Sequence, residues 1–213
     1  MNDLSFMRRN YDKKPLEIDS LLKCPFKQFE QWFVHATNRI REPNAMVLST
    51  VQPDGRPTLR SLLLKSYDES GFVFFTNYKS RKATQIEINN NVAMLFPWYS
   101  CQWQVEINGN ATKLTNAESL KYFALRPRGN QLGSWVSQQS AVVSSRGLLL
   151  NRLSELHAKF ADGDIPMPPS WGGYRIVPFR FEFWQGGRDR IHDRFQYLKC
   201  DDQENWSLSR LSP

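Results

Sequence analysis

Short apolar runs separated by tight-turn signals dominate residues 45–114 of the chain. The runs AMVLSTV (45–51) and TLRSLLLKSY (58–67) flank QPDGRP, and Asp-Gly between such runs is the strongest short-range signal for a β-hairpin. The turn DESG leads into a third run, FVFFTN (72–77). Two further strands are predicted, over 92–98 and 102–114. Strands joined by tight turns pair antiparallel, so the pattern predicts an antiparallel sheet or barrel.

Helical spacing of apolar residues marks four other segments. Helices are predicted after Pro25, from Ser80 to about Asn90, from Thr115 to about Leu125, and from Arg146 to Phe160. Ser80 is the expected N-cap of the second helix, and Thr115 with Glu118 three residues later forms a capping box. These helices are expected to pack outside the sheet, which predicts a mainly β fold with flanking helices.

The end of the chain predicts one more hairpin. The runs YRIVPFRFEFWQ and RIHDRFQYLK flank GGRD, and WSLSRL follows as a closing strand. The sequence contains no internal repeat, linker or low-complexity tract. We therefore expect a single domain over residues 25–213, preceded by a flexible N-terminal segment over residues 1–24.

The charge balance narrows the class of partner. The chain has 28 Lys and Arg residues against 21 Asp and Glu residues, a net charge of +7, which favours anionic partners. Nucleic acid, acidic membrane and phosphorylated small molecules all qualify, but the basic residues are dispersed and form no nucleic-acid arm. The three cysteines include no closely spaced pair, so neither a disulfide framework nor a metal site is expected. No apolar signal core or membrane-spanning run is present, so we expect a soluble cytoplasmic protein.

Basic side chains gather at the predicted last hairpin and at a predicted helix start. On an extended strand, Arg190, His192 and Arg194 would share one face, and such a face is either solvated or built around an anion. Arg81 and Lys82 fall in the first turn of the helix after Ser80, where cations oppose the helix dipole unless an anion is bound. An ordinary exposed turn is the alternative for this second group.

Two more pairs could serve a phosphate. Tyr122 and Arg126 are four residues apart on a predicted helix, although a half-buried Tyr beside a solvated Arg would have the same spacing. Arg60 and Lys65 lie on opposite faces of the strand over 58–67 unless a bulge redirects one of them. No nucleophile–base pair, HExxH, GxSxG or P-loop motif occurs, so the sequence predicts that a cofactor supplies the chemistry.

One long motif resembles a known family. The run FEFWQGGRDRIHDR (181–194) is similar to the signature of the pyridoxine (pyridoxamine) 5′-phosphate oxidase family, and the resemblance extends from RRNY at residues 8–11 to the end of the chain. It includes RSLLLKSYDESGFVFFTNYKSRKATQIE, FPWYSCQWQV, KYFALRPR, WVSQQS and RLSP. The resemblance implies a homodimeric FMN-binding split β-barrel with its clefts at the subunit interface. It also implies oxidation of pyridoxine or pyridoxamine 5′-phosphate at C4′ to pyridoxal 5′-phosphate, with hydride transfer to FMN and reoxidation by dioxygen to give hydrogen peroxide.

The resemblance also assigns residues, some of them from the opposite subunit. FMN contacts are expected at Arg60, Lys65, Phe75, Thr76, Arg81, Lys82, Gln104, Gln139, Ser140, Trp184 and Arg194. Substrate contacts are expected at Arg8, Tyr11, Lys65, Tyr122, Arg126, Asn130, Arg190 and His192, with Arg190 and His192 as the catalytic candidates.

Two positions depart from the family pattern. Asn130 stands where Ser is usual, and we expect changed phosphate affinity rather than lost function; Asn10 stands where Glu is common in the N-terminal flap. Two other functions remain open at this point. A non-oxidase FMN protein, such as a flavin reductase or a flavin-storage protein, would use the same barrel, and a basic nucleic-acid-binding barrel could stack bases on its aromatic residues.

Overall fold

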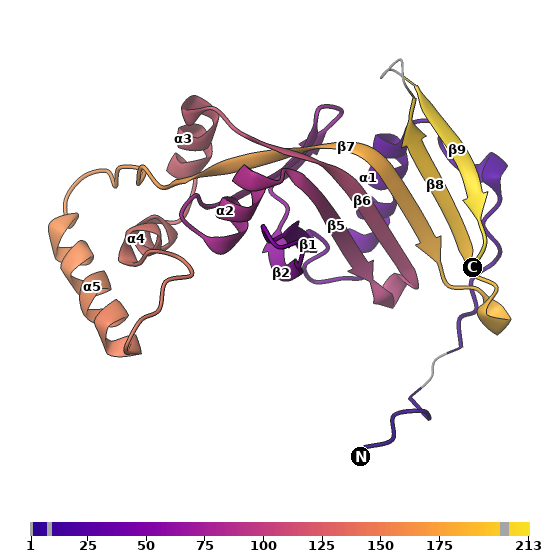
Figure 1. Ribbon diagram of the computed structural model, residues 1–213, viewed down its shortest axis with the longest axis horizontal. Coiled ribbons are helices and arrows are strands. Elements are labelled where there is room, and N and C mark those ends of the chain that lie inside the picture. The colour runs from indigo at the N-terminus through magenta and orange to yellow at the C-terminus, as the bar shows by residue number, and fades with distance from the viewer. Residues whose placement is uncertain (1, 8–9, 201–204) are drawn as a thin grey trace.

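The computed structural model describes residues 2–7, 10–200 and 205–213 (Figure 1). Its strands are β1 (Ala45–Val51), β2 (Pro57–Leu63), β3 (Ser66–Asp68), β4 (Gly71–Asn77), β5 (Asn91–Trp98), β6 (Trp103–Lys113), β7 (Trp171–Gln185), β8 (Asp193–Lys199) and β9 (Trp206–Leu211). Its helices are α1 (Pro25–Thr37), α2 (Arg81–Ile88), α3 (Asn116–Ala124), α4 (Arg128–Val136) and α5 (Arg146–Lys159), with short 3₁₀ turns η1 (Ile18–Ser20), η2 (Tyr99–Cys101) and η3 (Arg188–Arg190). The predicted antiparallel sheet with flanking helices is confirmed.

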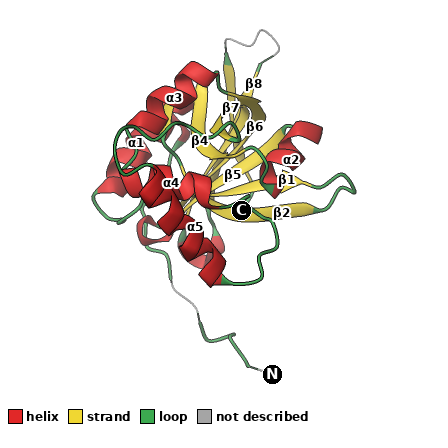
Figure 2. Cartoon of the chain, turned by 90° about the vertical axis from the view of Figure 1, so that its left-hand side faces the viewer, coloured by secondary structure: helices red, strands yellow, loops and turns green. Residues whose placement is uncertain are grey.

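The long strand β7 organises the sheet. One edge of β7 pairs with β6, whereas the other edge pairs first with β4, over residues 171–176, and then with β8, over residues 180–185. Pro178 lies between these two stretches, where β7 pairs with β6 alone. The β6 register shifts at the same level, between Asn108 and Gly109, and a Cβ at Gly109 would meet the Val177 carbonyl oxygen at 2.5 Å. The bulge and the change of partner together curl the sheet (Figure 2).

The prediction of a single strand over 58–67 is wrong. The structure has two strands there, β2 and β3, which lie at opposite ends of the strand order. β2 pairs with β1, and β3 pairs with β4. Between them the Leu64 N–H donates to the Asn44 carbonyl at 2.8 Å, and the Lys65 N–H donates to the Val73 carbonyl at 2.9 Å. The chain therefore passes from one margin of the curled sheet to the other without a turn signal in the sequence.

The main core lies between α1 and the sheet. Phe29 is fully buried, and its ring contacts Phe72, Phe96 and Trp98 at centroid distances of 5.0, 5.1 and 5.7 Å. Trp32, one turn further along the helix, stacks on Trp103 at 4.3 Å. This aromatic packing agrees with the helical spacing predicted after Pro25.

A second, smaller core joins α3, α4 and α5, which gather at one end of the molecule (Figures 1 and 2). Its buried members are Phe123, Leu132, Leu156, Ile165 and Trp171. α4 was not predicted, because RGNQLGSWV contains two glycines and Leu132 is its one fully buried side chain. In the described residues, no helix has the length and apolar character needed to cross a membrane.

The predicted capping box at α3 is confirmed and gives a stability prediction. The Glu118 N–H donates to Thr115 Oγ1 at 3.2 Å, and the Thr115 N–H donates to Glu118 Oε2 at 2.9 Å. Thr115→Ala should lower the free energy of unfolding by about 1 kcal/mol, because it leaves helix N–H groups without an acceptor. Thr115→Ser should retain most of this stability in urea unfolding, and equal loss in both variants would contradict a capping role.

The last hairpin differs from its prediction. β7 ends at Gln185 and β8 begins only at Asp193, with η3 between them. Asp189 and Arg190 take left-handed backbone conformations, with φ of 53° and 63°. Arg190 and His192 therefore precede the strand, and the expectation that they share a strand face with Arg194 is wrong.

The N-terminal segment lies along this hairpin. The Leu16 N–H donates to Asp193 Oδ2 at 2.8 Å, and Arg210 of β9 donates to the Leu16 carbonyl at 2.7 Å. Gln185 Nε2 donates to the Lys14 carbonyl at 2.8 Å. The segment is thereby held beside the loop that carries Arg190 and His192.

Candidate active site

Three basic residues form a cluster at the start of α2, and we call Arg60, Arg81 and Lys82 the cation cluster. Arg60 reaches it from β2, where it is half-buried, and Lys82 is only 6% exposed. Lys82 Nζ donates to Thr76 Oγ1 at 3.0 Å and to Ser80 Oγ at 3.3 Å. Ser80 occupies the N-cap position as predicted, but its hydroxyl makes no capping hydrogen bond and instead accepts from Lys82.

The cation cluster is short of negative charge. Burial, and after it the positive charge of Arg60, lower the pKa of the Lys82 ammonium to about 8. Burial and the charge of Arg81 also lower the pKa of the Arg60 guanidinium. Among the described residues, no carboxylate forms an ion pair with any member of the cluster. Buried cations without a counter-ion are costly, so the arrangement suits an anion held by these side chains at the N-terminus of α2.

The loop after α4 folds back onto this cluster. Gln139 Oε1 accepts hydrogen bonds from Thr76 Oγ1 at 3.3 Å and from the Asn77 N–H at 3.4 Å. Ser140, with a left-handed φ of 73°, accepts from the Arg81 N–H at 3.3 Å. A hollow of about 330 Å³ lies here, lined by Arg81, Gln139 and Ser140 among others. The structure thus places six predicted flavin contacts together: Arg60, Thr76, Arg81, Lys82, Gln139 and Ser140.

A second hollow, of about 400 Å³, adjoins the first. It shares Gln139 with the first hollow and is also lined by Phe75, Thr76, Arg126 and Asn130. Phe75 stacks on Tyr122 at 4.1 Å and on Trp171 at 5.2 Å, so aromatic rings form one wall. The predicted substrate contacts Tyr122, Arg126 and Asn130 are therefore neighbours of the predicted flavin contacts.

Arg126 lies two residues beyond α3 rather than on its face. Its guanidinium sits over the Trp171 ring at 4.8 Å and donates to Ser134 Oγ at 2.5 Å. Burial lowers the pKa of this guanidinium, yet no carboxylate of the described residues pairs with it. Like the cation cluster, Arg126 retains a charge that an anionic ligand could neutralise.

Lys65 is the exception among the predicted contacts at this end. Its backbone bonds to Val73, but its side chain is exposed and lines neither hollow. The break between β2 and β3 answers the question of opposite faces, because Arg60 and Lys65 do not belong to one continuous strand.

Three predicted flavin contacts form a row across the other end of the sheet. Gln104 of β6 is registered opposite Trp184 of β7, which is opposite Arg194 of β8, so their side chains share one face. Arg194 Nε donates to Glu182 Oε1 at 2.8 Å, and Arg180 Nη2 donates to Glu182 Oε2 at 2.6 Å. The hydrogen bond to Glu182 raises the pKa of Arg194, so this arginine, unlike Arg60, is charge-compensated.

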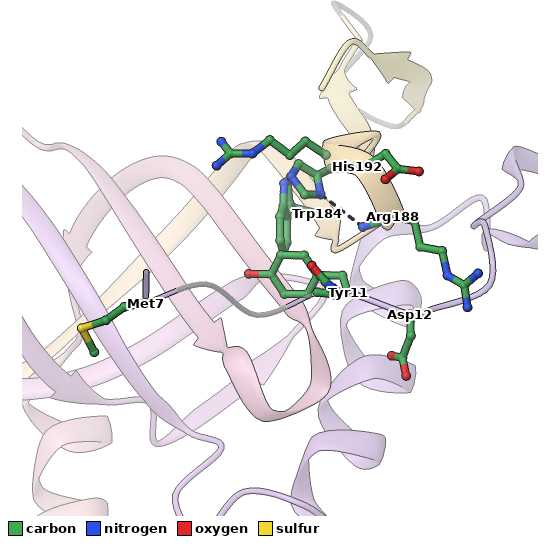
Figure 3. Close-up of a pocket in the computed structure, with 10 residues that line it drawn as sticks. Met7, Tyr11, Asp12, Trp184, Arg188 and His192 are labelled. Atoms are coloured by element: carbon green, nitrogen blue, oxygen red, sulfur yellow. Dashed lines mark hydrogen bonds between the residues drawn. The ribbon is translucent and has the colours of Figure 1, made fainter. Parts of the chain in front are cut away.

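A third hollow, of about 900 Å³, lies beside this row and contains the catalytic candidates (Figure 3). Its walls include Tyr11, Trp184, Arg190 and His192. The Tyr11 ring meets Trp184 at 5.6 Å and His192 at 5.7 Å, and Trp184 lies 4.8 Å from His192. The predicted substrate contact Arg8 lies outside the described residues.

Backbone contacts orient His192. The Gly187 N–H donates to His192 Nδ1 at 3.1 Å, so in the neutral ring the proton is on Nε2. A Cβ at Gly187 would meet the Ile191 carbonyl oxygen at 1.9 Å, so only glycine allows this close turn. The arrangement leaves Nε2 as a hydrogen-bond donor toward a ligand.

The residues around the cation cluster and those around His192 lie in different parts of the folded chain. In Figure 1, α4 is on the left and α2 lies between it and β5, whereas β8 is on the right. The structure therefore brings Arg81, Lys82 and Arg126 together, but it does not bring Trp184, Arg190 or His192 to them within a single chain.

Several polar residues that support the cation cluster were not predicted from the sequence. Thr50, Thr58 and Gln85 contact Arg60, and Ser134 contacts Arg126. Thr50 and Thr58 are cross-strand partners in the predicted Asp-Gly hairpin. Their equal distance from the turn could have indicated that they lie side by side. Ser134 carried no signal, because α4 was not predicted.

Comparisons with known proteins identify the family of this chain. A family model described as pyridoxamine 5′-phosphate oxidase matches residues 35–160, and one described as pyridoxine 5′-phosphate oxidase C-terminal dimerisation region matches residues 171–213. A protein of Crocosphaera subtropica named pyridoxine/pyridoxamine 5′-phosphate oxidase is 54% identical over 99% of this chain and 100% of its own length. One of the same name from Aliarcobacter butzleri is 51% identical, again over 99% of this chain and 100% of its own length.

Solved structures share the fold. PhzG from Burkholderia lata 383, solved in complex with tetrahydrophenazine-1-carboxylic acid, superposes with a TM-score of 0.88 at 30% identity, covering 96% of this chain and 100% of that one. A pyridoxamine 5′-phosphate oxidase-related, FMN-binding protein from Nostoc punctiforme gives a TM-score of 0.73 at 19% identity, covering 89% and 98%. The second likeness concerns the fold alone.

Proposed function

Because the chain belongs to the pyridoxamine 5′-phosphate oxidase family, we propose that it oxidises pyridoxine 5′-phosphate or pyridoxamine 5′-phosphate to pyridoxal 5′-phosphate with FMN. One observation carries the proposal: two adjoining hollows each present uncompensated positive charge. Arg81 of the cation cluster lines one hollow and Arg126 lines the other, while Gln139 lines both. Two phosphate-bearing molecules that react with each other need two such places side by side.

FMN fits the first of these places. Its phosphate would be held by Arg60, Arg81 and Lys82, with the N–H groups at the start of α2 and the polar groups of Gln139 and Ser140. Such a phosphate would supply the negative charge that the buried Lys82 lacks. FMN, when bound, supplies a two-electron acceptor for hydride from C4′ of the substrate and passes the electrons to dioxygen.

The substrate phosphate fits the second place. Arg126 would bind it through its guanidinium, which Ser134 and the Trp171 ring hold in position. The amide of Asn130 would donate a further hydrogen bond, and Tyr122 would add its hydroxyl. Lys65 would contact both ligands after its exposed side chain turns inward on binding.

A second copy of the chain would complete the site. The residues over 171–213 match a dimerisation region, and this part carries Trp184, Arg190, His192 and Arg194. In a twofold dimer the end of one chain that bears these residues would face the cation cluster of the other. Two equivalent sites would result, each walled by both chains in an FMN-binding split β-barrel dimer.

The chain's own groups then position the reacting carbon. Arg190 and His192 would lie against the pyridine ring of the substrate, with His192 Nε2 donating to one of its polar atoms. Tyr11, which already packs on Trp184 and His192, would cover the ring and exclude water. These contacts fix C4′ for transfer, because hydride transfer requires the donor carbon and the acceptor to be held close and aligned.

A spectrum and an oxygen electrode test the proposal. The purified protein should show flavin absorption after incubation with FMN, and pyridoxine 5′-phosphate in air should consume oxygen and yield one aldehyde per hydrogen peroxide formed. Flavin binding without aldehyde formation would favour a non-oxidase flavoprotein instead. A protein that cannot be loaded with FMN would contradict the proposal altogether.

A further inference from the structure

Among the described residues, Arg60 donates only to neutral acceptors. Its Nη1 donates to the Leu48 carbonyl at 3.0 Å and to Thr50 Oγ1 at 2.7 Å. Its Nη2 donates to Thr58 Oγ1 at 2.6 Å and lies 3.5 Å from Gln85 Oε1. These four contacts fix the orientation of the guanidinium, and none of them neutralises its positive charge.

Other arginines of the same sheet are held differently. Arg180 pairs with Glu106 and Glu182, Arg194 with Glu182, Arg175 with Asp68, and Arg210 with Asp193. In each case a carboxylate both positions the guanidinium and cancels its charge. The neutral surroundings of Arg60 therefore differ from the way this chain holds its other sheet arginines.

Gln85 is the residue at which a carboxylate could have stood. It lies on α2, one helical turn after Arg81, and it is only 3% exposed. Its Oε1 accepts from Thr50 Oγ1 at 2.5 Å, from Thr58 Oγ1 at 2.8 Å and from Arg60. Glutamate has the same shape and would offer an oxygen in the same place, so space does not dictate the amide.

We propose that Gln85 is a positioning residue of the anion site, which fixes Arg60 through a neutral oxygen and so leaves the charge of Arg60 for a phosphate. The inference rests on the proposed function for the identity of the ligand, FMN. It adds a residue that also lines the first hollow and whose side-chain oxygen accepts from Arg60 and the two threonines. Its action passes through Arg60, together with Thr50 and Thr58, which share the same Oε1.

Charge and shape can be separated with two substitutions at this position. Gln85→Glu keeps the acceptor and adds a negative charge beside Arg60, whereas Gln85→Met removes the acceptor without adding charge. A buried carboxylate this close to the guanidinium would offset much of its attraction for phosphate. Gln85→Glu should therefore weaken FMN binding by about tenfold or more, and Gln85→Met should weaken it less.

Riboflavin separates a charge effect from general damage, because it lacks the phosphate. Flavin fluorescence titrations of the full chain should show Gln85→Glu lowering the affinity for FMN while changing that for riboflavin by less than about twofold. Inorganic phosphate should raise the melting temperature of the flavin-free intact protein more than that of Gln85→Glu. The pair Thr58→Asp and Thr58→Val repeats the comparison from the other side of Arg60, should Gln85→Glu fail to fold.

The outcomes distinguish this inference from the proposed function. An unchanged ratio of FMN to riboflavin affinity in Gln85→Glu and Thr58→Asp would overturn the inference and leave an oxidase intact. A greater loss of FMN binding in Gln85→Met than in Gln85→Glu would also overturn it. An intact protein that binds neither FMN nor phosphate would remove the proposed function and the inference with it.

Discussion

Lys82→Met should weaken FMN binding by roughly one hundredfold. The Lys82 ammonium is almost fully buried and bonds only to the Thr76 and Ser80 hydroxyls among the described residues, so a flavin phosphate would be its charged partner. A charge-assisted hydrogen bond contributes about 1.5–3 kcal/mol, and each 1.4 kcal/mol is a factor of ten in affinity. Fluorescence titration of flavin-free protein with FMN measures the change.

Proton uptake should accompany the same binding step. Because the pKa of Lys82 is about 8 in the free protein, below its ordinary value of 10.5, the ammonium loses its proton as pH rises above about 8. A bound phosphate would favour the charged form and raise this pKa. FMN affinity should therefore fall above pH 8, by up to about tenfold per pH unit, whereas at lower pH Lys82 is already charged.

The lowered pKa of Lys82 also makes the stability of the flavin-free protein depend on pH, in the opposite direction to FMN affinity. Between about pH 8 and the ordinary pKa of 10.5, the unfolded chain binds more protons at Lys82 than the folded one, so flavin-free protein gains stability as pH rises. Both pH effects should vanish in Lys82→Met. Lys27→Met is the matched control, because Lys27 is an exposed lysine on α1 paired with Glu30, and it should leave FMN affinity and its pH dependence unchanged. Equal weakening of FMN and riboflavin by Lys82→Met would contradict a phosphate contact.

Mixed dimers should recover activity that their parent proteins lack. Lys82→Met removes the cation cluster's most buried member, and Arg190→Met removes a catalytic candidate, which should slow turnover by about a hundredfold or more. A dimer with one substitution in each chain has one site in which both changes fall and one in which neither does. With two different affinity tags to isolate it, this dimer should have about half the activity of the intact dimer.

The same two substitutions placed in one chain provide the control. Pairing that doubly substituted chain with an intact chain damages both sites, one through Lys82 and the other through Arg190. This dimer should be nearly inactive at FMN concentrations that leave the Lys82→Met site empty. If each site were built within one chain, the activities of the two mixed dimers would be reversed, so the comparison decides the matter.

Regular alternation and local signals predicted much of the fold. The strand over 45–51, the helix after Pro25 and the Thr115 capping box each depend on residues close in sequence, and the structure contains all three. The family resemblance rests on a long motif that includes Trp184 and Arg194, and the matching family models confirm it.

Features set by distant contacts could not be predicted in this way. The break at Leu64 and Lys65 depends on hydrogen bonds to Asn44 and Val73 that belong to other strands. The turn at η3 depends on left-handed conformations at Asp189 and Arg190. Non-glycine residues rarely adopt such conformations, so the sequence does not indicate them. The neutral shell of Arg60 likewise depends on a helix residue, Gln85, meeting two threonines of a hairpin.

Because β7 changes its partner strand along its length, this one strand lines two hollows that lie far apart. Trp171, near its start, walls the hollow that contains Arg126, and Trp184, near its end, walls the hollow that contains His192. Thirteen residues of extended chain span at most about 43 Å, so the length of β7 limits how far apart these two hollows lie. Inserting or deleting a pair of residues in β7 would preserve the alternation of faces and yet change the spacing between the two hollows.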